Sequence, residues 1–124
     1  MDICFITDAS PKDLLVTLSN GAYSSHSTKA GRYVKQAGVT NGRSFWMKAD
    51  AAIWYDDGGK NWIIGLRKQL GSNLCGLASA TDAGGSDPTD LAWRYWGGEK
   101  QWIGAGKDVR VQWAHEGMTQ PTLF

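Results

Sequence analysis

The sequence predicts an all-β fold, a small antiparallel sandwich or barrel of about eight to nine short strands joined by glycine-rich hairpin turns. Three observations favour this fold class. The 124 residues include seven tryptophans and sixteen glycines, a composition typical of aromatic strands that reverse direction tightly. Short apolar or alternating stretches recur at intervals of about ten residues. No stretch of about twelve residues keeps the apolar spacing of an amphipathic helix without a glycine or a turn signal.

The expected strands are separated by turn signals. Asn41-Gly42 is the strongest of these, because both residues tolerate the positive φ of a two-residue hairpin turn. Gly58-Gly59 and Gly97-Gly98 close two further hairpins. We expect strands at residues 13–18, 31–36, 44–48, 51–55, 61–66, 74–80, 92–96, 101–103 and 109–113, with a polar loop at 24–30.

Two of the expected hairpins carry the same residues in the same order. A tyrosine, two glycines, a lysine, a side-chain amide, a tryptophan, an isoleucine and a glycine follow one another at 55–65 and again at 95–104. Either similar hairpins use similar residues, or half of the domain is duplicated. Neither interpretation assigns a reaction to the chain.

Tryptophans dominate the expected core. Trp46, Trp54 and Trp62 stand eight residues apart on three successive expected strands, so we expect them to be cross-strand neighbours on one face of the sheet. Each buried tryptophan removes about 150–250 Å² of surface from water, a large contribution in a domain of this size. The residues that we assign to the structural core are Tyr33, Trp46, Trp62 and Ile64.

Length and charge limit the organisation and the partners of the chain. We expect a single β domain at residues 1–113 and an irregular tail at 114–124 that docks on the domain or on a neighbour. Thirteen basic and twelve acidic side chains give a net charge of +1, so no electrostatic footprint for nucleic acid is present. No apolar run approaches the roughly 18 residues of a membrane span. The start of the chain shows no secretory signal, and the sequence assigns no compartment.

An ordered series of motifs runs along most of the chain, from about residue 15 to residue 112. The motifs are Gly31-x-Tyr33, Asn41-Gly42-Arg43-x-Phe45-Trp46, Ile53-Trp54-Tyr55, Trp62-x-Ile64-Gly65, Pro88 and Trp93. The series resembles the Trp- and Gly-rich β modules that recur, often in tandem, in large proteins of protists, algae and marine invertebrates. These modules have no established catalytic role, so the resemblance implies a β-rich building block.

Most parts of a catalytic site are missing from the sequence. It contains no H-E-x-x-H, no G-x-S-x-G and no phosphate-binding G-x-x-x-x-G-K-[ST] motif. Glu99 and Glu116 are the only glutamates, and a glycosidase usually needs two opposed carboxylates. A small hydrolase would need a cleft that unites His26 or His115 with an aspartate or a cysteine. We therefore expect that the chain is not an enzyme.

Metal and cofactor sites are not expected either. Five aspartates crowd two glycine-rich loops without the ligand spacing of a calcium site, so we expect them to bond the backbone of their own turns. They are Asp56, Asp57, Asp82, Asp87 and Asp90. Cys4 and Cys75 are too few for a zinc site. They either form a disulfide, if their Cα atoms lie within about 7 Å, or remain two reduced thiols.

Binding is the function that the composition favours. A small chain cannot easily bury seven Trp, four Tyr and three Phe, and exposed apolar area usually marks a contact site. Strand ends near the two Gly-Gly turns are frequent binding positions. The candidate binding residues are Trp54, Tyr55, Arg94, Tyr95, Trp96 and Trp102.

The sequence thus predicts a non-catalytic interaction or structural module, an accessory subunit that binds a protein partner in a larger assembly through exposed aromatic residues. The alternative is a glycan-binding module that stacks sugar rings on exposed Trp and Tyr. In a third interpretation all of these aromatic residues belong to the core, and Arg94 and Lys100 only cover them with their aliphatic stems.

Overall fold

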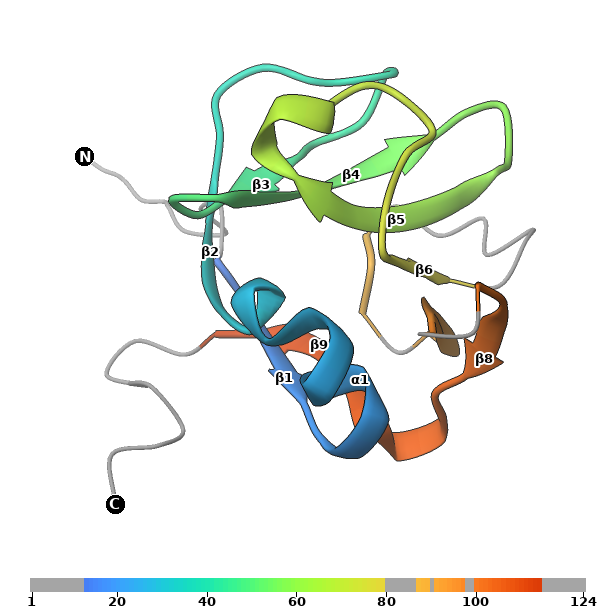
Figure 1. Ribbon diagram of the computed structural model, residues 1–124. Helices are drawn as coiled ribbons and strands as arrows, with labels where there is room; N and C mark the ends of the chain where they lie inside the picture. Colours follow the sequence, from blue (N-terminus) through green and yellow to red (C-terminus); the bar gives the residue numbers. More distant parts are fainter. Residues whose placement is uncertain (1–12, 80–86, 90, 98–99, 115–124) are drawn as a thin grey trace.

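The computed structural model describes residues 13–79, 87–89, 91–97 and 100–114. Within these ranges, nine antiparallel strands form one sheet that curls like a half-barrel (Figure 1). The predicted all-β fold is confirmed. The strands are β1 Leu14–Leu18, β2 Gly31–Lys35, β3 Trp46–Met47, β4 Ala51–Asp56, β5 Asn61–Leu66, β6 Leu77–Ser79, β7 Trp93–Trp96, β8 Trp102–Gly104 and β9 Val109–Trp113. The helices are α1 Asn20–His26 and three 3₁₀ turns, η2 Ser27–Lys29, η3 Arg67–Gln69 and η4 Gly106–Asp108.

The strand order is a meander with one long return. From β1 to β8, each strand pairs with the next along the chain. β9 then returns to pair with β1 over five residues, from Leu14 opposite Trp113 to Leu18 opposite Val109. β8 and β9 are therefore the two edges of the sheet.

The predicted turn at Asn41-Gly42 is confirmed. Asn41 has a φ of 53° and Gly42 a φ of 84°, as a two-residue hairpin turn requires. Thr40 and Arg43 exchange backbone hydrogen bonds of 2.9 and 3.2 Å across the turn. The Asn41 side chain also donates to the carbonyl of Tyr55 at 2.9 Å, which fixes the turn to β4.

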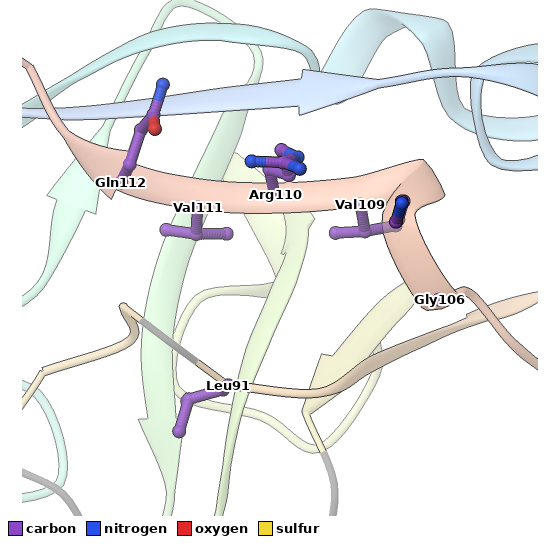
Figure 2. A pocket seen from close by; sticks show the side chains of 7 residues that line it. Leu91, Gly106, Val109, Arg110, Val111 and Gln112 are labelled. Atoms are coloured by element: carbon purple, nitrogen blue, oxygen red, sulfur yellow. The ribbon is translucent and has the colours of Figure 1, made fainter.

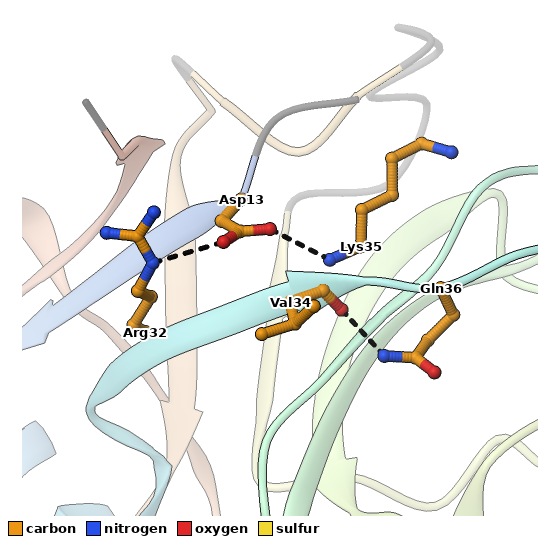
Figure 3. Close-up of polar contacts among 5 residues, drawn as sticks. All are labelled: Asp13, Arg32, Val34, Lys35 and Gln36. Atoms are coloured by element: carbon orange, nitrogen blue, oxygen red, sulfur yellow. Dashed lines mark hydrogen bonds and ion pairs between the residues drawn. The ribbon is translucent and has the colours of Figure 1, made fainter. Parts of the chain in front are cut away.

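Asp13 fixes three strands at one corner of the sheet (Figure 3). Its carboxylate accepts hydrogen bonds from Arg32 Nε at 3.1 Å and from the backbone N–H of Lys35 at 3.2 Å, both on β2. Its carbonyl accepts from the N–H of Ala114 at 2.9 Å, just after β9. Near the same corner, the Gln36 side chain donates to the Val34 carbonyl at 2.9 Å. These bonds hold β2, β1 and β9 in register.

Helix α1 occupies part of the segment where the sequence predicts a polar loop, so the loop prediction is wrong for residues 24–29. A seven-residue helix is not stable alone. Ala22 is fully buried against the sheet, and the side chains of Ser19 and Asn20 each donate to Asp108 Oδ1 at 2.9 Å. Tertiary contacts, which no local pattern reveals, therefore stabilise α1.

One face of the sheet, here called the inner face, carries the main core. The four residues assigned to the core from the sequence, Tyr33, Trp46, Trp62 and Ile64, are all buried in it. The ring centroids of Trp46 and Trp62 lie 6.0 Å apart, and those of Tyr55 and Trp62 5.4 Å apart, both edge to face. This geometry is favourable for aromatic pairs.

The expectation that Trp46, Trp54 and Trp62 share one face is wrong for Trp54. In the observed register Trp46 lies opposite Ile53, and Tyr55 lies opposite Trp62. Ile53 and Tyr55 on β4 therefore share the inner face with Trp46 and Trp62. Side chains alternate between the two faces along a strand, so Trp54 points to the other face, here called the outer face.

The outer face of β4 and β5 is covered by the segment that follows β5. Trp54 packs there with Ile63 and Ala78, and Leu70 of the covering segment lies against them. The indole N–H of Trp54 donates to the Ser72 carbonyl at 3.0 Å. This segment thus forms a second layer that buries this part of the sheet. Most of the segment has no regular secondary structure.

Some predicted bounds differ from the structure, as expected for short strands. The strand expected at 44–48 is limited to Trp46–Met47, the one expected at 74–80 begins at Leu77, and the one expected at 101–103 spans Trp102–Gly104. The predictions for the tail after Ala114 and for six further residues concern parts of the chain outside the described residues, namely Cys4, Asp82, Asp90, Glu99, His115 and Glu116.

Candidate functional site: an aromatic surface on β7 and β8

Two exposed tryptophans lie side by side near one edge of the sheet. Trp96 on β7 pairs directly with Trp102 on the edge strand β8. Their side chains are 41% and 37% exposed, and their ring centroids lie 5.4 Å apart at an interplanar angle of 74°. Together with Arg94, which shares the outer face with them, they form what we call the aromatic surface.

Arg94 is held against Trp102. Its guanidinium carbon lies 4.8 Å from the centroid of the Trp102 ring, within the range of a cation–π contact. Within the described part of the chain, Arg94 Nε has no hydrogen-bond partner, so stacking rather than an Nε bond positions this side chain. Opposite Arg94 stands Gly104, where an added Cβ would meet nothing within 4 Å. The surface is thus ordered and accessible.

A difference in turn length explains why Trp102 is exposed although its counterpart in the repeated motif, Trp62, is buried. In the first hairpin Trp62 lies opposite Tyr55, on the inner face. In the second, Gly97 and Gln101 share a backbone bond of 2.8 Å, and Trp102 lies opposite Trp96 instead of the motif tyrosine. A register shift of one residue moves a side chain to the other face of the sheet.

The expected exposure of Trp54 and Tyr55 is wrong, because they are 0% and 5% exposed. β4 is a central strand with neighbours on both sides. Trp54 is covered by the segment after β5, and Tyr55 packs on Trp62 while Arg43 lies 4.0 Å above its ring. Neither side chain belongs to the aromatic surface.

Tyr95 is half-buried and faces helix α1 rather than solvent. It lies opposite Leu77 and Ile103 on the inner face, with its ring edge-on to His26 at 6.3 Å. A Cβ at Gly21 of α1 would collide with the Tyr95 hydroxyl. Of the six candidate binding residues, Arg94, Trp96 and Trp102 therefore come together at the surface. Tyr95 packs on the opposite, inner face of β7.

His26 is a residue of this site that the sequence did not indicate. At the end of α1, its Nε2–H donates to the carbonyl of Trp96 at 2.9 Å, and its Nδ1 accepts from Lys29 Nζ at 3.4 Å. This pattern requires a neutral ring with the proton on Nε2. A Cβ at Gly76 would collide with the ring, so the glycine makes room for it. The polar segment around His26 gave no signal for this contact.

The electrostatics around His26 favour the neutral ring. Burial is the main cause that lowers the pKa of His26, and the nearby Lys29 lowers it further, while the bond to Trp96 acts in the opposite direction. Burial also lowers the pKa of Lys29, an effect that Asp50 and Cys75 oppose. The pair of His26 and Lys29 positions α1 against β7.

Other groups with possible chemistry have structural partners. Asp56 accepts from the N–H of Gly59 at 3.2 Å, and Asp87 accepts from the N–H of Thr89 at 2.9 Å, as turn aspartates do. Among the described residues Cys75 has no disulfide partner, and burial raises the pKa of its thiol to about 11. In the part of the chain that the structure describes, no three His, Cys, Asp or Glu side chains come together to hold a metal ion.

Comparison with known proteins gives no relative on which to base a function. No family model, no curated protein and no solved structure matches the chain. Among the described residues, no helix has the length and apolar character to cross a membrane. The functional argument therefore rests on the geometry of the aromatic surface.

Proposed function

We propose that this chain is a non-catalytic interaction module, an accessory or structural subunit that binds a protein partner in a larger assembly through Arg94, Trp96 and Trp102. The observation that carries the proposal is the pair of exposed indoles whose ring centroids lie 5.4 Å apart. Adjacent exposed apolar side chains of this size usually mark a contact site. Trp and Arg are also the residue types that dominate binding energy at protein interfaces.

The arrangement of the three side chains supports a protein partner. Trp96 and Trp102 hold each other edge to face, and Arg94 is stacked on Trp102. Side chains that are already ordered lose less conformational entropy on binding. In addition, the hydrogen bond from His26 fixes the backbone carbonyl of Trp96 at 2.9 Å, so the strand beneath the surface is braced by α1.

The test is quantitative co-purification from native extract with tagged wild-type chain and the double variant Trp96→Ala/Trp102→Ala. We expect the double variant to lose the proteins that the wild type retains, because each alanine removes an anchor worth about 2 kcal/mol or more at such interfaces. The matched control is Val39→Ala, since Val39 is 64% exposed and lies outside the strands, in the connection between β2 and β3.

Circular dichroism of each variant checks that the fold is retained. A wild-type chain that runs alone and monomeric in native extract would contradict the proposal. So would a double variant that retains every partner while the control behaves like the wild type.

A glycan-binding module is the second candidate, favoured by the corner that the two indoles form at 74°, in which a sugar ring could stack on Trp96. It is the weaker candidate, because Arg94 covers one face of Trp102. A glycan array followed by titration of tryptophan fluorescence tests it. Saturable binding of a free oligosaccharide that Trp96→Ala abolishes would favour this function over the first.

A further inference from the structure

The edge strand β8 directs main-chain groups away from its neighbour β7. Gln101 and Ala105, which flank β8, have backbone hydrogen bonds of 2.8 and 2.9 Å to Gly97 and Trp93. Residues along an antiparallel pair alternate in the direction of their hydrogen bonds. The N–H and C=O groups of the residues in between, Trp102 and Gly104, therefore point to the other side of the strand.

This side of β8 is accessible. Gly104 is exposed, and since a glycine has no side chain, the exposed surface belongs to the main chain. Trp102, two positions earlier on the same side, is 37% exposed. Among the described strands, β8 pairs with β7 alone. An exposed edge with unpaired main-chain groups is a template for pairing with a further strand.

The other edge strand, β9, is less accessible. Val109 and Val111 are 3% and 6% exposed and belong to the main core. Figure 2 shows their side chains on the side of β9 that faces Leu91, in the pocket that all three residues line. Of the two edges, β8 is therefore the better site for the main chain of a partner.

A positive charge lies beside the β8 edge. Arg94 on β7 stands opposite Gly104, and among the described residues it has no ion pair with a carboxylate. Neighbouring strands lie about 4.8 Å apart, so a residue added beyond Gly104 would be about 10 Å from Arg94, Cα to Cα. The side chains of an arginine and a glutamate together cover this span, and Gly104 leaves the space between them open. A carboxylate at this position would pair with the guanidinium group.

We propose that the partner adds an extended segment to β8, antiparallel to it, with an acidic side chain opposite Gly104 and an apolar one opposite Trp102. This inference rests on the proposed function, because it specifies the partner's chemistry at the same aromatic surface. Added strands gain main-chain hydrogen bonds from the edge, and their alternate side chains share one face. A second copy fits less well, because Trp102–Gly104 offers no acidic side chain of its own.

The test is an NMR titration of the isotope-labelled full chain with three blocked peptides. The first, Thr-Val-Glu-Val-Leu-Val-Thr, places the acidic and the apolar side chain two positions apart. The second has lysine in place of glutamate. The third carries a methyl group on the leucine amide nitrogen, which removes one main-chain donor and keeps every side chain.

We expect the first peptide to shift the amide signals of Trp102 and Gly104 saturably. The N-methylated peptide should bind about tenfold more weakly, since it lacks a main-chain hydrogen bond, and the lysine peptide should also bind more weakly, because it places a like charge beside Arg94. Equal binding of the N-methylated peptide, or no binding of the first peptide at millimolar concentration, would overturn the proposal.

A charge variant locates the acidic side chain. Arg94→Gln should weaken binding of the first peptide about threefold to fivefold, as expected for the loss of a partly exposed charge pair. Arg67→Gln makes the same change on the exposed turn η3 and should leave the affinity unchanged. Equal weakening by both variants would show a general charge effect and contradict a site beside Gly104.

A proline variant separates strand addition from docking of side chains alone. Gly104→Pro removes the outward N–H and leaves the side chains of the aromatic surface in place, and edge strands tolerate proline where the N–H faces solvent. Gly104→Ala keeps the N–H and is the matched control. In the co-purification experiment we expect Gly104→Pro to lose the partners that Gly104→Ala retains, with circular dichroism as the check on folding.

The two proposals fail in different ways. If Gly104→Pro retains the partners that Trp96→Ala/Trp102→Ala loses, the proposed function stands and strand addition is wrong. If neither variant loses a partner, both proposals are wrong. The N-methylated peptide needs no change in the chain, so it decides the question even if Gly104→Pro does not fold.

Amide hydrogen exchange identifies any other occupant of the edge. We expect the amides of Trp102 and Gly104 to exchange readily in the chain alone and to become protected when the first peptide binds. Protection without peptide that is independent of concentration would place another part of the same chain on β8. Protection that rises with concentration would place a second copy there, and either result contradicts a partner segment.

Discussion

His26 connects three parts of the structure through one imidazole ring. It ends α1, bonds the Trp96 carbonyl at 2.9 Å on β7, and accepts from Lys29 at 3.4 Å on η2. A second proton on the ring would remove the acceptor for Lys29 and place two positive charges side by side. The contact therefore depends on a neutral histidine.

This dependence predicts how stability changes with pH. Because the folded-state pKa of His26 is lowered from its ordinary value of 6.5, the unfolded chain binds the proton more tightly than the folded chain. The stabilisation that the contacts of neutral His26 give to the folded chain is present above the ordinary pKa. It is lost as the pH falls from 6.5 through the folded-state pKa. We expect the urea midpoint to fall between about pH 7 and pH 5, and to fall less in His26→Gln.

The comparison variant is His115→Gln, which removes the other histidine of the chain and keeps the His26 contacts with Trp96 and Lys29. If the urea midpoints of His26→Gln and the wild type fall in parallel between about pH 7 and pH 5, protonation of His26 is not the cause of the pH dependence.

At single residues, the sequence predicts burial better than exposure. The eight-residue spacing of the tryptophans placed Trp46 and Trp62 in the core, to which Tyr33 and Ile64 were also assigned, and the structure has all four there. The same reasoning failed for Trp54, whose cover is the segment after β5, and that segment has no periodicity over Ser72–Leu74. Whether a side chain is exposed depends on which other segments of the chain cover it. The sequence around that side chain does not show this.

At the scale of elements, turn geometry sets which face each side chain occupies. The Asn41-Gly42 turn was predictable, because few residue pairs accept positive φ at both positions. The two Gly-Gly hairpins were predictable as turns, and Lys60 and Lys100 take positive φ of 55° and 61° at matching places. Their registers were not predictable from the repeated motif, and the one-residue difference decides whether a tryptophan lies in the core or at the surface.

Replacement of Gly42 tests the turn. Gly42→Ala should lower the free energy of unfolding by about 1–2 kcal/mol, because an L side chain is strained in the left-handed region, here at a φ of 84°. Chemical denaturation followed by circular dichroism measures the change.

The matched control is Gly58→Ala in the next hairpin. There an added Cβ would meet only the Asp56 carboxylate, at 3.7 Å, and Gly58 is not among the glycines with positive φ. We expect a change below about 0.5 kcal/mol, typical of tolerated surface substitutions. Equal losses for the two variants would show that backbone strain at Gly42 is not the cause.

For the molecule as a whole, five of the tryptophans fall into a buried and an accessible set, and the cover over each part of the sheet decides between them. Trp46, Trp54 and Trp62 are at most 2% exposed, whereas Trp96 and Trp102 are 41% and 37% exposed. We expect the double variant Trp96→Phe/Trp102→Phe to lose most of the fluorescence that iodide quenches. Trp54→Phe should lose only emission that iodide does not reach. Quenching that is unchanged in the double variant would contradict the assignment of the aromatic surface.

The sequence left the strand order open. Consecutive strands usually pair, as β1 to β8 do, but β9 pairs with β1 at the opposite end of the described chain. Long-range pairing of this kind depends on the curl of the whole sheet, which a local pattern does not encode.

The place of β1 has a consequence for protein synthesis. β1 emerges from the ribosome early, with apolar residues such as Leu14 and Val16 that are fully buried in the finished fold. Its partner β9 is translated after the other described strands. Strands β1 to β8 can associate in the order in which they are made, but one side of β1 remains uncovered until translation has passed Trp113. A nascent chain with an unpaired apolar strand is prone to aggregation, so ribosome-associated chaperones would protect this chain for as long as β9 has not been made.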